Sequence, residues 1–390
     1  MIYLDHHATT PVDSRVLDAM LPYFCEHPGN AASRNHGFGR TAFNAVESAR
    51  AEVASLIGAS AREIAFTSGA TESDNLAVKG VAEALHERGD HIITQRTEHK
   101  AVLDSARRLE RRGFRVTVLD VDSQGLVDPD ALRAAMSDKT ILVSVMWTNN
   151  ETGAAQDLAA LGAITRERGV YLHCDASQGL GYIPLDVSQV PVDLVSFTAH
   201  KVYGPKGVGA LYARRRNPRV SLVAEIDGGG HEFGMRSGTL NVPGIVGFGA
   251  ACALQRDESA VEAIRLRALR ETLFTKLQGL GGVLLNGPPL DGPRHPGNLN
   301  VSIDGLDPGS LMVEMAKTVA VSSGSACSTG SGEPSYVLRA MGLSRDRAAS
   351  SIRYGLGRST TQADIDTAFE VTRAAVTKLR AAYNSAPAGW

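Results

Sequence analysis

Cys327 is a candidate nucleophile because of the segment that surrounds it. From Ser322 to Gly332 the chain has eleven residues without one large side chain. Glycine and small residues offer no packing surface and leave the backbone free to sample many conformations. We therefore expect Cys327 to lie on a mobile, solvent-accessible loop, as suits a thiol that has to move during a reaction. The alternative is a glycine- and serine-rich surface loop with an incidental cysteine.

Lys201 and Asp175 each follow a predicted strand. Lys201 precedes a Gly/Pro turn, and a lysine at a sheet edge within a cleft can lose its proton and become a nucleophilic amine. Asp175 ends the strand predicted at residues 170–175, where a carboxylate faces the cleft of an open sheet and can pair with a cationic heterocycle. The alternatives are a surface lysine and a turn or helix-cap aspartate.

A phosphate site is predicted where the strand at residues 63–67 meets the next helix. Small residues in the run Thr67-Ser-Gly-Ala-Thr-Glu-Ser-Asp-Asn75 leave backbone N–H groups accessible, and the helix dipole favours an anion there. Thr71 lies in this run, and Thr198 and His200 beside Lys201 are further candidates. The run lacks the Gly-Lys-Ser/Thr ending of a P-loop, and its Ser and Thr residues are equally typical of ordinary N-caps.

His99 and Arg353 complete the set of candidates. His99 follows a strand at a helix start, where an imidazole can act as acid or base or stack on a ring, although a lone histidine is more often structural. Arg353 lies among apolar and small residues, as is typical of an arginine that binds a carboxylate. Together the candidates provide what pyridoxal phosphate requires: phosphate contacts, a ring-nitrogen partner, a Schiff-base amine, a stacking group and a binding group for an amino-acid carboxylate.

Alternating strand-like and helix-like segments position these candidates between about residues 60 and 215. Strands are predicted at residues 63–67, 91–94, 114–121, 140–147, 170–175, 194–198 and 207–212. The segments between them have helical patterns at residues 71–87, up to 112, 128–136 and 157–168. This alternation indicates an α/β fold with a mostly parallel sheet, and a ligand is expected at the ends of its strands.

The pattern changes after about residue 242. A long helix to about residue 280 precedes short strands at residues 282–285, 298–303 and 319–322. The last helix, at residues 362–382, carries a core-facing stripe of Ile365, Phe369, Thr372, Val376 and Leu379. We predict a large domain of residues 16–254 and a smaller α+β domain of residues 1–15 and 255–390, which carries the cysteine loop at about residues 322–333.

Bulk composition argues against several classes of protein. The 390 residues are 43% hydrophobic and carry a formal net charge of −2, so we expect no direct binding of nucleic acid or of an anionic membrane. Four widely spaced cysteines suggest neither a metal site nor a disulfide framework. The N-terminus resembles no signal peptide and no apolar stretch approaches the length of a membrane span, so we expect a cytoplasmic protein.

Seven motifs, in collinear order over roughly residues 2 to 380, closely resemble the cysteine desulfurases, which are pyridoxal-phosphate enzymes of the class V aminotransferase group. They are Leu4-Asp5…Ala8-Thr-Thr-Pro11, Thr67-Ser-Gly-Ala-Thr-Glu-Ser-Asp-Asn75, Thr97-Glu-His-Lys100, Asn149-Asn-Glu151, His200-Lys-Val-Tyr-Gly-Pro-Lys-Gly207, Met235-Arg-Ser-Gly-Thr239 and Ser322-Ser-Gly-Ser-Ala-Cys327. The resemblance implies the fold type I architecture, with a large mostly parallel-sheet domain and a smaller α+β domain. The long loop around Cys327 is similar to the subgroup that includes the iron–sulfur-cluster desulfurases.

The resemblance also implies a role for each motif residue. For the reaction, Lys201 is the Schiff-base amine, Cys327 is the persulfide carrier, and His99 stacks on the ring and shuttles protons. For the cofactor, Asp175 pairs with the ring nitrogen, Gln178 bonds the ring's phenolic oxygen, and Ala70 is a cofactor contact; Thr71, Thr198 and His200 hold the phosphate, and Thr239 reaches the phosphate across a homodimer interface. For the substrate, Asn150 contacts both cofactor and substrate, and Arg353 binds the substrate carboxylate.

The implied reaction removes sulfur from L-cysteine. Lys201 is the expected base for the α-proton, and the Cys327 thiolate then attacks the substrate sulfur, which leaves a persulfide on Cys327 and releases alanine. The persulfide sulfur passes to an acceptor protein, for iron–sulfur cluster assembly or for DNA phosphorothioation. The C-terminus lacks the longer tail of housekeeping iron–sulfur desulfurases, so the sequence leaves the acceptor open.

Two residues depart from the pattern of many relatives. Ala199 stands where glycine is common, which is tolerable if the backbone there is ordinary. Phe233 replaces a charged residue and is expected to alter the edge of the cleft or a partner surface. Two other hypotheses are another class V reaction, such as transamination or selenocysteine cleavage, and a non-enzymatic scaffold. The thiol on its loop argues against transamination, and the complete set of candidate residues argues against a scaffold.

Overall fold

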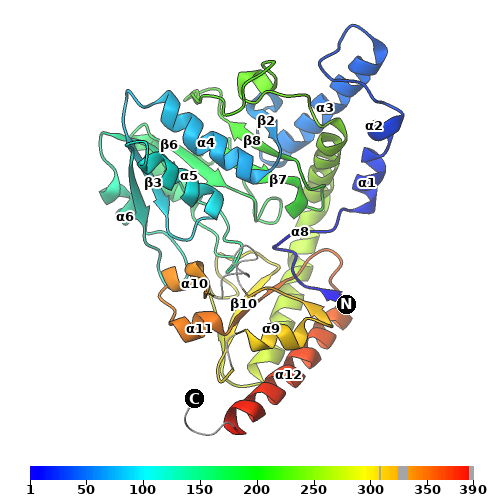
Figure 1. The fold of residues 1–390 in the computed structure, drawn as a ribbon, viewed down its shortest axis with the longest axis vertical. Helices are drawn as coiled ribbons and strands as arrows, with labels where there is room; N and C mark the ends of the chain where they lie inside the picture. Colours follow the sequence, from blue (N-terminus) through cyan, green and yellow to red (C-terminus); the bar gives the residue numbers. More distant parts are fainter. Residues whose placement is uncertain (307–308, 324–332, 386–390) are drawn as a thin grey trace.

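A seven-stranded sheet occupies the upper half of the computed structural model, which describes residues 1–306, 309–323 and 333–385 (Figure 1). Its strand order is β2-β8-β7-β6-β5-β3-β4, in which β8 is antiparallel to both of its neighbours and the other pairs are parallel. The strands are β2 (Ile64–Thr67), β3 (His91–Gln95), β4 (Arg115–Leu119), β5 (Thr140–Ser144), β6 (Tyr171–Asp175), β7 (Leu194–Thr198) and β8 (Gly209–Ala213). The predicted α/β fold with a mostly parallel sheet is confirmed.

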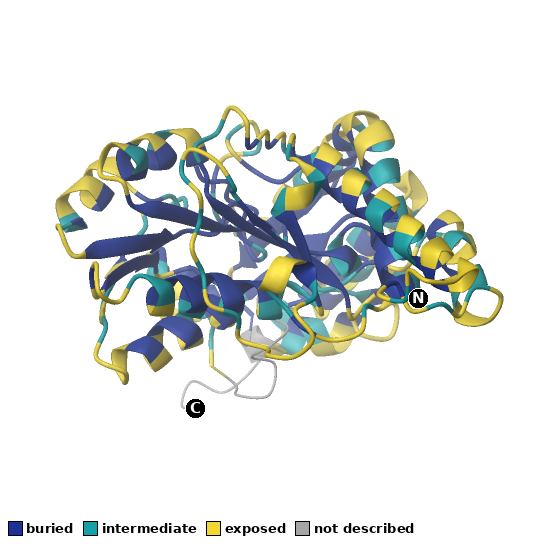
Figure 2. Ribbon diagram, turned by 90° about the horizontal axis from the view of Figure 1, so that it is seen from above, coloured by how far each residue is buried: buried dark blue, intermediate teal, exposed yellow. Residues whose placement is uncertain are grey.

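Helices cover both faces of this sheet (Figure 2). The helices of this half are α1 (Ser14–Met20), α2 (Pro22–Cys25), α3 (Gly37–Leu56), α4 (Ala70–Ala84), α5 (Lys100–Glu110), α6 (Pro129–Ala135), α7 (Leu158–Glu167) and α8 (Val242–Gln278), with short 3-10 turns η1 (Ala61–Glu63), η2 (Ala199–Lys201) and η3 (Glu232–Gly234). Of these, α1 and α2 pack on α8 rather than on the sheet. Successive side chains of a strand point to opposite faces. Leu142 and Leu194 therefore pack in a core with α4 and α5, whereas Val143 and Val195 pack in a core with α3, α7 and α8.

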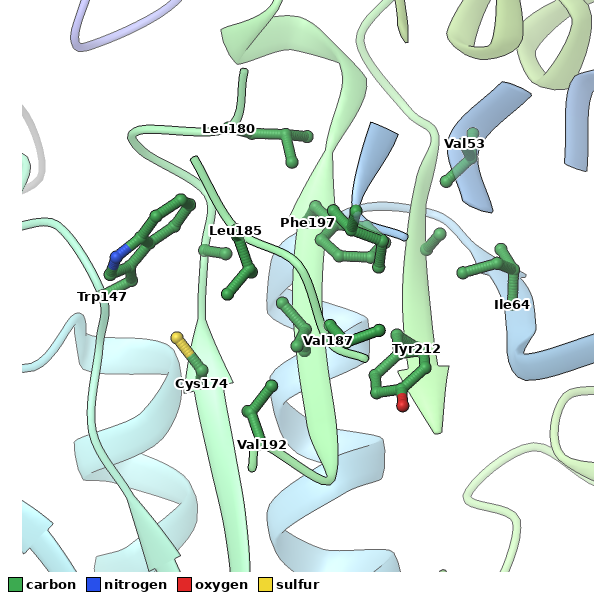
Figure 3. Close-up of a cluster of buried hydrophobic side chains, with 14 of the residues drawn as sticks. Val53, Ile64, Trp147, Cys174, Leu180, Leu185, Val187, Val192, Phe197 and Tyr212 are labelled. Atoms are coloured by element: carbon green, nitrogen blue, oxygen red, sulfur yellow. The ribbon is translucent and has the colours of Figure 1, made fainter. Parts of the chain in front are cut away.

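Figure 3 shows part of the core on the α3 side, where Trp147, Cys174 and Phe197 lie among apolar side chains of the segment between β6 and β7. Cys174 is completely buried there, and burial raises the pKa of its thiol well above the ordinary value. A thiol that is kept protonated and away from solvent is a poor nucleophile. Cys174 is thus a packing residue, although it immediately precedes Asp175.

A second core lies in the lower half of Figure 1, around a three-stranded antiparallel sheet of order β12-β10-β9. The elements are β9 (Val283–Leu285), β10 (Asn298–Ile303), β11 (Val319–Ala320), β12 (Ser351–Gly355), α9 (Ser310–Met315), α10 (Tyr336–Ala340), α11 (Arg345–Ala349) and α12 (Gln362–Ser385). The predicted stripe of α12 faces this core: Ile365, Thr372 and Val376 are buried, and Phe369 and Leu379 pack against the same cluster.

Helix α8 joins the two halves of the molecule. Its first turns pack in the core of the large sheet through Phe248 and Cys252, and its last turns pack in the second core through Leu269 and Leu273. The helix runs without interruption past residue 254, where we predict the domain boundary. The division into residues 16–254 and residues 1–15 with 255–390 stays a prediction.

The N-terminal arm, residues 2–10, also joins the two halves. Its strand β1 (Ile2–Tyr3) pairs in parallel with β11 of the lower half, and Asp5 forms a bridge with Gly355 at the end of β12. Further along the arm, Thr10 donates its hydroxyl hydrogen to the carbonyl oxygen of His200 at 2.9 Å. The arm therefore passes from the small sheet to the end of β7.

Most predicted elements are present with ends shifted by a few residues. The clearest difference is the apolar run at residues 140–147, of which only Thr140–Ser144 is regular strand. The rest of the run stays close to β6, since Trp147 N–H donates to the Asp175 carbonyl at 2.9 Å. In the described part of the chain, no helix is both long and apolar enough to cross a membrane.

Candidate active site

A cavity of about 530 Å³ opens at the carboxyl edge of the seven-stranded sheet. Parallel strands place their carboxyl ends at one edge, and β2, which is separated from β7 by antiparallel β8, runs in the same direction as β7. The segments that follow β2, β3, β5, β6 and β7 therefore meet there. Arg353 of β12 and the N-terminal arm close the other side of the cavity.

Ten of the predicted site residues line this cavity. They are Ala70, Thr71, His99, Asn150, Asp175, Gln178, Thr198, His200, Lys201 and Arg353. Thr239 does not line it and is exposed to solvent, and its predicted role across a homodimer interface stays a prediction. Cys327 lies outside the described residues, so its predicted mobile loop stays a prediction.

The predicted phosphate site combines a helix N-terminus with two side chains. Gly69 precedes α4 with a φ of 153°, a value that suits glycine, and it places Ala70 and Thr71 in the first turn of the helix at the cavity. The first N–H groups of a helix have no partner within it, so they are available to an anion. Thr198 and His200 come from the end of β7 and from η2.

His200 lies partly buried beside the N-terminal arm. Its Nδ1 lies 3.1 Å from the Thr9 hydroxyl oxygen of the N-terminal arm. Burial lowers the pKa of His200 to about 4, and the charges of Lys201 and Lys206 act in the same direction. Ala199 immediately precedes His200, and its backbone φ is not positive. An alanine therefore fits at this position without strain, as expected from the sequence.

Lys201 ends the 3-10 turn η2, directly after β7. Its amine lies at the cavity, where it donates a hydrogen bond to the carbonyl oxygen of His7 in the N-terminal arm. This contact crosses from the large sheet to the arm. The amine is thus directed into the cavity, as the prediction of a nucleophilic lysine requires.

Asp175 lies at the end of β6 with two buried carboxyl groups close by. Its Oδ1 accepts a hydrogen bond from the Ser177 N–H at 2.9 Å. Burial raises the pKa of Asp74 and of Glu98 well above the ordinary values, and the negative charge of Asp175 raises both further. Burial therefore favours the protonated, uncharged form of both neighbours. Asp175, the last residue of β6, lines the cavity, where a carboxylate is placed to pair with a cation.

His99 has a structural role as a helix cap and also lines the cavity. It is the N-cap of α5, and its Nδ1 accepts a hydrogen bond from the Ala101 N–H at 3.1 Å. Because Nδ1 is the acceptor, the proton of the neutral ring is on Nε2. The cap holds the imidazole at the cavity wall, where it is available to stack on a ring or to transfer a proton.

Arg353 is the middle residue of β12, and its exposed fraction is 1%. Its guanidinium donates to Asp5 Oδ1 at 2.7 Å and to the carbonyl oxygen of Asn150 at 2.8 Å. One contact comes from the N-terminal arm and the other from the segment after β5. These two contacts fix the guanidinium at the cavity, where it can bind the carboxylate of an amino acid.

Sequence reasoning missed several residues of the cavity, above all His7 and Glu151. Both stand inside motifs that were used for the resemblance, yet neither was given a role. Glu151 accepts a hydrogen bond from the Ser335 hydroxyl, and burial raises its pKa to about 7. For Glu151, the available signal was a titratable side chain next to a predicted site residue, Asn150. Tyr336, which also lines the cavity, gave no such signal.

Phe233 lies away from the cavity. It has a φ of 59°, is 48% exposed, and its ring lies between the guanidinium groups of Arg50 and Arg215 at 5.3 and 5.1 Å. It is not among the residues that line the cavity, so the predicted effect on the edge of the cleft has no support. An effect on a partner surface stays a prediction.

The cavity fits pyridoxal phosphate. The helix N-terminus at Thr71 suits a phosphate, the Asp175 carboxylate suits a protonated ring nitrogen and the Lys201 amine suits a Schiff base. Among the described residues, several buried polar atoms of the cavity lining have no hydrogen-bond partner, including Nε2 of His7, Oγ of Ser177 and both carboxyl oxygens of Asp74. Buried polar groups normally have partners, so these atoms indicate a site for a polar ligand.

Known proteins resemble this chain over nearly its whole length. Residues 2–368 match the model of the family described as "Aminotransferase class-V". A protein named "Cysteine desulfurase IscS" from Anaeromyxobacter sp. (strain Fw109-5) is 60% identical over 380 residues, which are 97% of this chain and 92% of that protein.

Two solved structures extend the likeness to the fold. A "NIFS-LIKE PROTEIN" superimposes with a TM-score of 0.90 at 37% identity and covers 97% of this chain and 100% of its own. A structure described as "SspA in complex with cysteine" has a TM-score of 0.81 at 35% identity and covers 91% of this chain and 99% of its own. With the cavity residues and these similarities together, the chain belongs to the class V aminotransferase family and, within it, to the cysteine desulfurases.

Proposed function

We propose that this protein is an L-cysteine desulfurase that takes sulfur from free L-cysteine, releases L-alanine and hands the sulfur to an acceptor protein. The observation that carries the proposal is the meeting of Lys201, Asp175 and Arg353 in one cavity beside the N-terminus of α4. An amine, a carboxylate and a carboxylate-binding arginine are the groups that pyridoxal-phosphate chemistry on an amino acid needs.

The residues of the large sheet would hold the cofactor. The first turn of α4, with Ala70 and Thr71, and the side chains of Thr198 and His200 would bind its phosphate. Asp175 would pair with the ring nitrogen. Gln178 would bind the ring's phenolic oxygen, and His99 would stack on the ring. Bound there, pyridoxal phosphate withdraws electrons from the α-carbon of an amino acid and so makes its proton removable.

Arg353 and Asn150 would hold the substrate. The guanidinium of Arg353 is fixed by Asp5 and by the Asn150 carbonyl, so it is already oriented at the cavity before a substrate binds. A substrate carboxylate bound there would hold the α-carbon in the cavity that Lys201 also lines. The Lys201 amine would then act as the base for the α-proton.

Cys327 would take the sulfur. Its thiolate would attack the sulfur of the substrate, so that an S–S bond forms on Cys327 as the C–S bond of the substrate breaks. The described flanks of its segment support this role. Ser322 pairs with Arg353 through two backbone hydrogen bonds of 3.2 and 2.7 Å, and Ser335 donates to Glu151. The segment that carries Cys327 is therefore flanked on both sides by residues that contact the cavity lining, Ser322 at Arg353 and Ser335 at Glu151.

A second copy of the chain would complete the site. Thr239 follows η3, is exposed and does not line the cavity of its own chain. In a homodimer it would reach the phosphate of the partner's cofactor. The sulfur acceptor would be a protein of iron–sulfur cluster assembly, with DNA sulfur modification as the alternative. We propose a cytoplasmic location, since Cys25, Cys174 and Cys252 are unpaired, as in a reducing compartment.

Product analysis with L-cysteine tests the proposed function. We expect the purified yellow holoenzyme to form L-alanine and sulfide in equal amounts when a thiol reductant is present. Cys327→Ser should keep the cofactor absorption and lose turnover by about 10³-fold or more, because no thiolate is left to attack the sulfur. Cys25→Ser, which changes an exposed free cysteine, should keep the full rate. Full turnover in Cys327→Ser would refute the persulfide role.

Transfer of labelled sulfur tests the acceptor. After one turnover with ³⁵S-cysteine, we expect the label on Cys327 and then on an iron–sulfur scaffold protein. Transfer of the label to a protein of DNA sulfur modification would instead identify the alternative acceptor. Absence of label on the protein in the presence of alanine formation would contradict the proposed route of the sulfur.

A further inference from the structure

His7 of the N-terminal arm holds both ends of the Gln178 carboxamide. The Gln178 Nε2 donates to the carbonyl oxygen of His7 at 2.9 Å, and the Gln178 Oε1 lies 3.1 Å from Nδ1 of the His7 ring. The two residues are 171 positions apart in the sequence. A single residue of the arm therefore fixes which way the carboxamide of Gln178 points.

The chemistry of the two hydrogen bonds determines the orientation of the amide and the tautomer of the ring. A backbone carbonyl oxygen only accepts hydrogen bonds, so the end of Gln178 that contacts it is the NH₂ group. The other end is then the carbonyl oxygen, which also only accepts. Nδ1 of His7 must therefore carry the hydrogen, and Nε2 of the neutral ring is the unprotonated nitrogen.

The surroundings of His7 hold the ring in this state. It is 3% exposed, and its ring packs edge-on against that of His295 with centroids 4.7 Å apart. His295 is packed in turn by Tyr182, at 5.0 Å. Burial lowers the pKa of His7 well below its ordinary value, and the neighbouring His295 and Arg353 lower it further. The ring therefore stays neutral and keeps its single N–H for Gln178.

We propose that His7 is the positioning residue of Gln178, which it fixes with one amide N–H available to the phenolic oxygen of the cofactor ring. The Gln178 NH₂ group has two hydrogens, of which the His7 carbonyl takes one. Without the Nδ1 donor, only the His7 carbonyl oxygen holds the carboxamide, and its Oε1 end has lost its partner, so the amide N–H is directed less firmly at the phenolic oxygen. This inference rests on the proposed function, in which Gln178 contacts that oxygen.

The binding of pyridoxal phosphate to the full-length protein tests the proposal. His7→Leu removes the donor, and we expect cofactor binding about 3- to 10-fold weaker, as for the loss of one net hydrogen bond. His7→Asn should restore most of the affinity, because its side-chain nitrogen is as many bonds from the backbone as Nδ1 of histidine. The dissociation constant is measured by titration of the visible absorption of the bound cofactor.

His6 provides a matched control. It is the adjacent histidine, is equally buried at 4% exposed, and packs on Tyr3 and Tyr203 rather than on the cavity. We expect His6→Leu to change thermal stability but to leave the cofactor dissociation constant within about 2-fold. Equal weakening by His6→Leu and His7→Leu would show that the arm acts only through its folding and would overturn the proposal.

A double-mutant cycle tests whether His7 acts through Gln178. In a Gln178→Ala background, His7→Leu should weaken cofactor binding by less than about 2-fold, because the amide that it orients is gone. An undiminished effect of His7→Leu in that background would overturn the proposal. These measurements contain no substrate, so they remain decisive if the protein binds the cofactor but does not release sulfur from cysteine.

Discussion

The carboxyl edge of the large sheet and the N-terminal arm contribute to the same cavity in different ways. At the edge, Asp175 and Thr198 are the last residues of β6 and β7, so the strands themselves bring them to the cavity. In the arm, Asp5 reaches Arg353 across 348 positions of the sequence. The positions of the edge residues depend on local structure and strand direction, whereas the positions of the arm residues depend on contacts between distant segments.

The difference has a consequence for mutation. A substitution at the edge removes one chemical group and leaves the sheet in place, because the strand is held by its own ladder of hydrogen bonds. A substitution in the arm changes a contact that positions another residue, so its effect is indirect and smaller. The comparison predicts large effects on chemistry at the edge and moderate effects on stability and geometry in the arm.

Lys201 is the edge residue for which we expect the largest effect. Lys201→Ala should lower the turnover of L-cysteine by about 10³-fold or more and abolish the Schiff-base absorption, because both the nucleophilic amine and the base are removed. The measurement combines alanine formation with the visible spectrum of the purified protein.

Lys206 is the matched control, since it is a second lysine that lines the cavity and follows the same strand. Lys206→Ala should keep the absorption band and turn over L-cysteine. A Lys201→Ala protein with an unchanged visible band would contradict the assignment and would mean that another amine holds the cofactor.

Glu151, also at the edge, should make stability depend on pH. Its pKa is raised from 4.5 to about 7 by burial, so the folded state holds a proton that the unfolded state has released between these two values. The contribution of Glu151 to stability is therefore complete below about pH 4.5 and is lost as the pH rises to about 7. The loss amounts to about 3 kcal/mol.

Glu151→Gln should remove this dependence, because the amide cannot ionise and its oxygen still accepts the hydrogen bond from Ser335. We expect the variant to gain stability over the wild type between pH 5 and pH 8, as measured by urea unfolding. Glu110→Gln, at an exposed position, serves as the control. Parallel pH curves for the wild type and Glu151→Gln would show that Glu151 ionises normally in the folded protein.

Asp5 tests the arm, and we expect the smallest effect there. Asp5→Asn should lower the free energy of unfolding by about 1–2 kcal/mol, because the buried guanidinium of Arg353 keeps a hydrogen-bond acceptor but loses its charged partner. Urea unfolding checks this value, with the exposed Asp18→Asn as the control. A loss of turnover as great as that of Lys201→Ala would erase the distinction between arm and edge.

Strand patterns predicted much of the fold and of the edge. The limits of β7 and β10 match the predicted residues, and the alternation of strands and helices indicated the parallel sheet. His99 and Asp175 followed from their places at strand ends. These successes share one cause: periodicity and strand direction are local properties, and they dictate where the ends of parallel strands meet.

The roles of His7, Glu151 and Asp74 did not follow from the sequence. Each is a titratable residue within a motif, but its function depends on burial and on neighbours far along the chain. Burial alone accounts for most of the raised pKa of Glu151 and of Asp74, and burial is a property of the folded molecule. Likewise, the tautomer of His7 is fixed by Gln178, 171 positions away.

The sequence by itself determined the chemical inventory of this protein. Lys201, Asp175, Arg353 and Cys327, together with the order of the motifs, indicated a pyridoxal-phosphate desulfurase. Only the tertiary structure decided how the inventory is oriented, because hydrogen-bond geometry and desolvation arise when the arm, the large sheet and the small sheet come together. The residue types thus determine which reaction is possible, and the long-range contacts determine which hydrogen bonds hold the groups in place for it.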